Sequence, residues 1–108
     1  MFESKYDQSE NVLTFVFSGH MDSARSAPLA PIVENKVKEC AGDPFHATKP
    51  LKVVFDLKEV DFISSAFIRI CMVVLAKVKS GNLVLQNATP FIKKTIKITG
   101  LESQLTVL

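Results

Sequence analysis

The stretch that decides the fold runs from Leu51 to Gly81 and reads LKVVFDLKEVDFISSAFIRICMVVLAKVKSG. It opens with a β-branched run, LKVVFDL, which is typical of a strand in a sheet interior and which we expect to end at the charged KEVD segment. From Ser65 the pattern changes, because residues 66–76 carry a single charge, at Arg69. Lysines and Gly81 then supply the stop signals of a helix. The stretch therefore predicts a strand followed by a buried helix.

The sequence before this stretch predicts a hairpin and one helix. Phe2 to Tyr6 is a weak strand candidate and Val12 to Phe17 a stronger one, and together they resemble an opening hairpin. Glycine, proline and aspartate predict a loop over Ala41 to Pro50. The helix is predicted by apolar residues at helical spacing that end near Cys40, while two prolines restrict its regular part to the residues after them. These apolar residues are Leu29, Ile32, Val33 and Val37, with prolines at 28 and 31.

The sequence after this stretch predicts a strand, a helix and a short final strand. The run NLVLQN, residues 82–87, is the strand, and Leu105 to Val107 is the last one. The helix lies in TPFIKKTIKITG, where the residue types fit a cap, a first position, an inner face and an exit. These are Thr89, Pro90, Ile92, Ile96 and Gly100 in turn. The order β-β-α-β-α-β-α-β predicts an α/β fold with a mixed and mostly parallel sheet of four or five strands.

Length and composition indicate one ordinary domain over residues 1–108, with 47% hydrophobic and 22% charged residues. A formal charge of +2 is too small to predict direct nucleic-acid binding. The apolar run is shorter than the ~20 residues of a membrane span, and the acidic N-terminus is unlike a signal peptide, so we expect a cytoplasmic protein. The predicted core comprises Val53, Val54, Phe55, Ile70, Val74, Leu83, Val84 and Leu85.

Candidate metal and catalytic sites are poorly supported. Cys40 and Cys71 show no CxxC spacing and no His cluster, so we expect no metal site and no cofactor. His20, Asp22 and Ser65 could in principle form a hydrolase triad, but the chain lacks a G-x-S-x-G elbow, and we expect no enzyme. The basic outer face of the last helix either meets an acidic partner or is simply solvated. It comprises Lys93, Lys94 and Lys97.

Two serines at the start of the apolar helix carry the functional question. Either Ser64 or Ser65 can cap the helix, a role worth ~1 kcal/mol. Alternatively, Ser65 accepts a phosphate, which the helix dipole favours at this end and which Arg69, one turn later, could pair with. On the first interpretation Arg69 is a solvated surface charge.

Nearly the whole chain resembles the STAS domains, a family that includes bacterial anti-sigma factor antagonists. The resemblance rests on FSGHMD, LKVVFDLKEVDFISS and GNLVLQNATPFIKKTIKITGL, which occur in that order. It implies a STAS-like sheet protein with three or four helices and without catalytic chemistry of its own. The resemblance also implies regulation by a partner serine kinase that phosphorylates one serine at the start of the second helix.

The family motif Asp-Ser-Ser-Gly implies roles for individual residues. Ser64 takes the place of the aspartate, Ser65 that of the phosphoacceptor, Ala66 that of the second serine and Phe67 that of the glycine. Asp22 similarly matches an acidic residue beside the acceptor that contributes to kinase docking. The loss of the aspartate removes a negative charge, and Phe67 places a large ring where a partner backbone would approach.

Two functions are expected from this resemblance. The first is a phosphorylation-switched regulator that sequesters an anti-sigma factor serine kinase, releases a sigma factor and is reset by a phosphatase. The alternative is a STAS-like accessory or scaffold subunit of a transporter or signalling complex, without a switch. For the docking surface around Ser65 we expect at least one of Phe67 and Ile68 to face outward, and an exposed aromatic ring there would make a small apolar patch with a polar rim. That surface comprises Asp22, Ser64, Phe67, Ile68 and Arg69.

Overall fold

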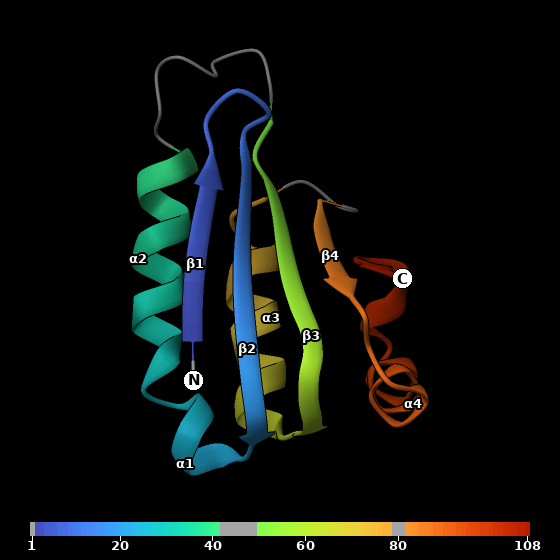
Figure 1. Cartoon of the computed structure of the whole chain (residues 1–108). Coiled ribbons are helices and arrows are strands. Elements are labelled where there is room, and N and C mark those ends of the chain that lie inside the picture. The colour runs from blue at the N-terminus through green and yellow to red at the C-terminus, as the bar shows by residue number, and fades with distance from the viewer. Residues whose placement is uncertain (1, 42–49, 79–81) are drawn as a thin grey trace.

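The computed structural model describes residues 2–41, 50–78 and 82–108. Its centre is a five-stranded sheet with the strand order β1-β2-β3-β4-β5 (Figure 1). Only β1 and β2 pair antiparallel, and the other neighbours pair parallel, as the alternating sequence pattern predicts. The strands are β1 (Phe2–Asp7), β2 (Val12–Met21), β3 (Lys52–Ile63), β4 (Leu83–Gln86) and β5 (Thr106–Val107).

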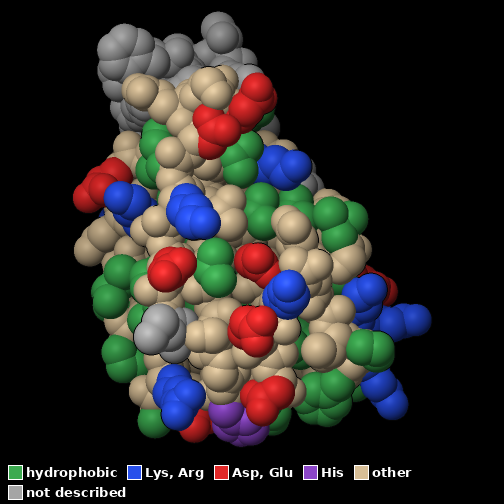
Figure 2. Space-filling model, in the orientation of Figure 1, with side chains coloured by type: hydrophobic (Ala, Val, Ile, Leu, Met, Phe, Trp, Pro, Cys, Tyr) green, Lys and Arg blue, Asp and Glu red, His purple; other side chains and the backbone are tan. Residues whose placement is uncertain are grey.

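The helices lie behind and beside this sheet. Figure 1 shows α3 behind β2 and β3, α2 to the left of β1 and α4 below β4. The helices α2 and α3 pack against each other. The face turned away from α2 and α3 carries interspersed acidic and basic side chains (Figure 2), which agrees with the small net charge. The helices are α1 (Ser23–Ser26), α2 (Leu29–Ala41), α3 (Ser65–Leu75) and α4 (Pro90–Thr99), followed by the short 3-10 helix η2 (Leu101–Ser103). Within the described ranges, no helix combines the length and the apolar character needed to span a lipid bilayer.

The strand β3 is longer than its sequence predicts. It does not end at the charged KEVD segment but continues to Ile63. The reason is that Leu57, Val60 and Ile63 are buried, while the charged side chains between them point to solvent. Shifts of register against β2, after Val16 and after Gly19, keep the two strands paired over this length. The prediction that β3 ends early is therefore wrong.

Two helix details also differ from the sequence pattern. Ile32 is 50% exposed and so lies outside the apolar stripe of α2, which buries Val33, Val37 and Cys40 instead. The helix α3 ends at Leu75, before the lysines. Most of the predicted loop at residues 41–50, and the predicted stop at Gly81, fall outside the described residues.

The core forms where sequence periodicity places it. All eight predicted core residues are buried, the most exposed being Val54 at 7%. Phenylalanine rings fill the space between the sheet and α3: the ring of Phe67 meets Phe17 and Phe55 edge to face, with centroids 5.2 and 5.9 Å apart. Such contacts contribute about 0.5–1.5 kcal/mol each beyond their buried area. They fix the position of the start of α3.

The helix α4 follows its predicted pattern closely. Thr89 Oγ1 accepts a hydrogen bond from the Ile92 amide at 3.3 Å, and Pro90 occupies the first position. Gly100 ends the helix at φ 79°, a left-handed conformation that glycine adopts without strain. Ile92 and Ile96 are fully buried. The final strand, β5, is present but has only two residues.

Candidate functional site

Two neighbouring strands end side by side and deliver the candidate residues to one edge of the sheet. Met21 at the end of β2 and Ile63 at the end of β3 are paired in register. The next residue in each chain segment, Asp22 or Ser64, is the N-cap of a helix. These two helices, α1 and α3, pack against each other. The parallel sheet thus places both caps at the same edge.

The two serines at the start of α3 have different environments. Ser64 Oγ accepts a hydrogen bond from the Phe67 amide at 3.4 Å, and the Ser64 carbonyl accepts one from the Ile68 amide at 3.0 Å. Ser65 is the first helical residue and its side chain is exposed. Within the described part of the chain, the Ser65 hydroxyl has no hydrogen-bond partner. The cap is therefore Ser64, and the hydroxyl of Ser65 is accessible.

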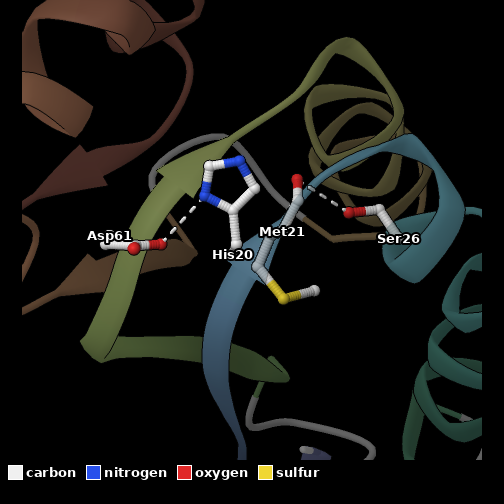
Figure 3. Close-up of polar contacts among 4 residues, drawn as sticks. All are labelled: His20, Met21, Ser26 and Asp61. Carbon is white, nitrogen blue, oxygen red and sulfur yellow. Dashed lines mark hydrogen bonds and ion pairs between the residues drawn. The ribbon is translucent and has the colours of Figure 1, made fainter.

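Asp22 has a structural role at this edge. Its Oδ1 accepts a hydrogen bond from the Arg25 amide at 2.9 Å, which caps α1. In the same turn the buried Ser26 hydroxyl donates to the carbonyl oxygen of Met21 at 3.2 Å (Figure 3). The half-buried carboxylate of Asp22 is consequently held where β2 ends, next to the strand that leads to Ser64.

Of Phe67 and Ile68 one faces outward, as predicted, but it is Ile68, and the assignment of Phe67 to the docking surface is wrong. Phe67 is fully buried, because the third position of α3 points into the sheet, where the rings of β2 and β3 surround it. Ile68 is partly exposed, so that this larger apolar side chain of the same turn reaches the surface, as does the small side chain of Ala66. Phe67 therefore supports the surface from below and cannot itself touch a partner.

A groove of about 820 Å³ runs between α3 and α4. Ser64, Ser65 and Arg69 lie towards the end of the groove where α3 begins, and Ser65 and Arg69 also line a second hollow, of about 320 Å³, beside α1 and α2. Sequence reasoning did not predict the groove. The sequence signal that could have indicated the groove is the composition of α3, which has apolar side chains on its solvent-facing side as well as on its buried side. The groove is lined by Ile63, Ser64, Ser65, Ile68, Arg69, Met72, Val73, Ala76, Thr95 and Thr99.

The candidate triad is not assembled by hydrogen bonds. His20 lies on β2, where its Nδ1 is 3.3 Å from Asp61 Oδ1 (Figure 3) and its ring stacks on Phe62 with centroids 4.3 Å apart. In residues 2–41, 50–78 and 82–108, no side-chain hydrogen bond joins His20 to Asp22 or Ser65, although the Asp22 backbone amide donates to the His20 carbonyl oxygen at 2.8 Å. The polar partner of His20 is thus a surface carboxylate on β3.

The remaining candidate groups have simple surroundings. Cys40 and Cys71 are both buried, and burial raises the pKa of the Cys71 thiol to about 12, so that it is neutral at physiological pH. Lys93, Lys94 and Lys97 are exposed on α4. The described residues contain no group of three or more His, Cys, Asp or Glu side chains that could hold a metal ion.

Comparison with known proteins agrees with this architecture. The family model of the STAS domain matches residues 4–107. No curated protein matches the sequence.

Solved structures share the fold at low sequence identity. The anti-sigma factor antagonist SpoIIAA in its unphosphorylated form is similar with a TM-score of 0.65 and 10% identity, over 100% of this chain and 87% of that one. The Bacillus cell fate determinant SpoIIAA in its phosphorylated form has a TM-score of 0.62 and 12% identity, over 100% of this chain and 91% of that one. An anti-sigma factor antagonist from Mycobacterium paratuberculosis has a TM-score of 0.67 and 20% identity, over 99% of this chain and 85% of that one.

A chain of another kind of assembly is equally similar in fold. It belongs to the ATP-bound MlaFEDB complex of Acinetobacter, with a TM-score of 0.66 and 16% identity, over 97% of this chain and 98% of that one. At these identities the similarity establishes the fold alone.

Proposed function

Because the chain belongs to the STAS domain family, we propose that it is a regulatory binding protein of the anti-sigma factor antagonist type. On this proposal it has no catalytic activity and acts in the bacterial cytoplasm. It sequesters an anti-sigma factor serine kinase, and this releases a sigma factor. The kinase phosphorylates Ser65 and so ends the binding, and a phosphatase restores it.

The observation that supports the proposal most strongly is that the two serines have different roles. Ser64 caps α3, while Ser65 is exposed. A phosphate on Ser65 therefore does not remove the cap, which is worth about 1 kcal/mol. The first turn of a helix favours negative charge, because its amide groups and dipole point towards the anion. The fold would thus tolerate the modification.

The same phosphate would disturb the surface around it. It adds about two negative charges, and these make burial of the surface against a partner costly. Asp22 lies at the same edge of the sheet and adds to the repulsion of acidic partner groups. The proposed docking surface comprises Ser65 with Asp22, Ser64, Ile68 and Arg69, supported from beneath by Phe67.

A binding assay with three variants tests this proposal. The partner is a serine-kinase anti-sigma factor encoded next to this gene, and the affinity is measured by calorimetry. Ser65→Ala should bind like the parent, and Ser65→Asp should bind at least about tenfold more weakly, because charge at an interface typically costs this much. Ser4→Asp, at an exposed serine of β1, is the matched control and should leave the affinity unchanged. If Ser65→Asp bound as tightly as the parent, the switch would be refuted.

The groove favours a second candidate, an accessory or scaffold subunit of a transporter or signalling complex. Five of its ten lining residues are apolar, and permanent interfaces are more apolar than transient ones. The similarity in fold to a chain of the MlaFEDB complex supports this alternative. Copurification with a complex that survives both Ser65→Asp and high salt would favour the subunit over the switch.

A further inference from the structure

The groove between α3 and α4 has an uneven distribution of charge. Its lining consists of apolar and hydroxyl side chains, with one cation, Arg69. Within the described part of the chain, the lining includes no carboxylate. The cation lies near the end where α3 begins, together with Ser64 and Ser65. The groove therefore fits a ligand that is apolar along most of its length and acidic near one end.

The shape of the groove fits a helix. Its α3 wall extends from Ser65 to Ala76, which at 1.5 Å per residue is about 16 Å, or three helical turns. The groove is open along this wall, since Met72 is 55% exposed. An acyl chain is normally enclosed by its binding site, whereas an amphipathic helix lays one face into an open groove.

The α4 side of the groove continues the same chemistry at the surface. Phe91, Lys94 and Ile98 share one side of α4 by their spacing of three and four residues, next to Thr95 in the wall. Phe91 is 55% exposed and Ile98 77% exposed. This rim offers apolar contacts with a lysine between them.

Charge decides between the possible occupants. A second copy of this chain, paired through the same rim, would bring its own exposed lysines at 93, 94 and 97 against these, and like charges in contact are unfavourable. A partner with acidic side chains would instead complement Arg69 and Lys94.

We propose that this groove binds an amphipathic helix of the partner protein, with its apolar face on Ile68 and Met72 and with acidic side chains beside Arg69 and Lys94. The inference rests on the proposed function in one respect: the helix belongs to the partner that Ser65 phosphorylation releases. Arg69 then links the two roles, because it lies one turn after Ser65 on α3. A phosphate on Ser65 competes with the acidic side chain of the partner for the Arg69 guanidinium. That acidic side chain then lies beside the negatively charged phosphate and is repelled.

Selection from a display library tests the inference without knowledge of the partner. The library holds helical peptides of about four turns with randomised side chains, and the full-length chain is the target. Enriched peptides should carry apolar residues at the i, i+3, i+4, i+7 spacing with Asp or Glu beside them. Enrichment of basic peptides, or of none above a blank selection, would overturn the proposal.

Variants of the target then locate the site. Met72→Glu should weaken the selected peptides at least about tenfold, because it places a charge against their apolar face. Ile32→Glu is the matched control, since Ile32 is 50% exposed on α2 and outside the groove, and it should change nothing. Arg69→Glu should weaken acidic peptides by about fivefold or more. Equal binding to the parent and to Met72→Glu would contradict the proposal.

The outcomes separate this inference from the switch. Acidic peptides that bind in the groove and remain bound to Ser65→Asp would support the groove and contradict the competition for Arg69. Conversely, Ser65→Asp could weaken binding of the anti-sigma factor kinase while Met72→Glu leaves binding of every peptide unchanged. That result would support the switch and contradict the proposed groove site.

Discussion

The helices α3 and α4 begin in the same way but differ at one position. In each, a hydroxyl side chain caps the amide three residues later, Ser64 for Phe67 and Thr89 for Ile92. In each, that third residue is fully buried. The first helical residue is Ser65 in α3 and Pro90 in α4.

This difference shows which residue at the start of α3 is not needed to form the helix. Proline suits the first position because its fixed φ fits the helix and its missing N–H costs no intrahelical bond there. In α4 the cap, the first helical residue and the buried third residue thus each have a structural explanation. In α3 the Ser64 cap and the buried Phe67 ring are sufficient to position the start of the helix, and Ser65 has no structural role there. An exposed hydroxyl with no structural duty is a candidate for function.

The largest expected effect concerns the buried third residue. Phe67→Ala should lower the unfolding free energy by about 3–5 kcal/mol, because it leaves a cavity among the rings of the core. Phe91→Ala in α4 is the control, since that ring is 55% exposed, and it should cost less than about 1 kcal/mol. Urea denaturation measures both. A similar cost for the two variants would show that Phe67 does not anchor α3.

A pH effect should come from the buried face of α3, which carries a titratable group that α4 lacks. Burial raises the pKa of Cys71 to about 12, while an unfolded chain deprotonates its thiol near its ordinary pKa of about 8.5. Between these values the unfolded state binds fewer protons than the folded state, so stability should be complete below the lower value and fall as pH rises through the window. The slope is at most about 1.4 kcal/mol per pH unit.

Urea denaturation between pH 7 and 11 measures this dependence. Cys71→Val, which retains an apolar side chain without the thiol, should have a shallower decline over the same range. Identical pH profiles for the parent and this variant would contradict a buried neutral thiol in α3.

The smallest effects should distinguish the two serines. Ser64→Ala and Thr89→Ala each remove a cap and should cost about 1 kcal/mol. Ser65→Ala removes a hydroxyl that caps nothing and should change stability by less than about 0.5 kcal/mol. Thermal unfolding of the three variants tests this order. A Ser65→Ala cost equal to that of Ser64→Ala would mean that both serines stabilise the helix.

Sequence reasoning predicted the sheet, the helix order and the core because each depends on local periodicity. It also placed Thr89, Pro90 and Gly100, whose residue types have few other uses in that order. It failed where a side chain's direction depends on the rest of the fold. The burial of Phe67 follows from the rings of β2 and β3 around it, and the length of β3 from its pairing with β2. The groove arises from the approach of two helices that are distant in sequence.

The central claim is that Ser65, and not Ser64, is the regulatory position. The most direct test is to incubate the chain with ATP and the serine-kinase anti-sigma factor encoded beside it, and to locate the phosphate by mass spectrometry. We expect phosphate on Ser65 in the parent and none in Ser65→Ala. Phosphate on Ser64, or an unmodified chain under conditions in which the kinase is active, would contradict the claim.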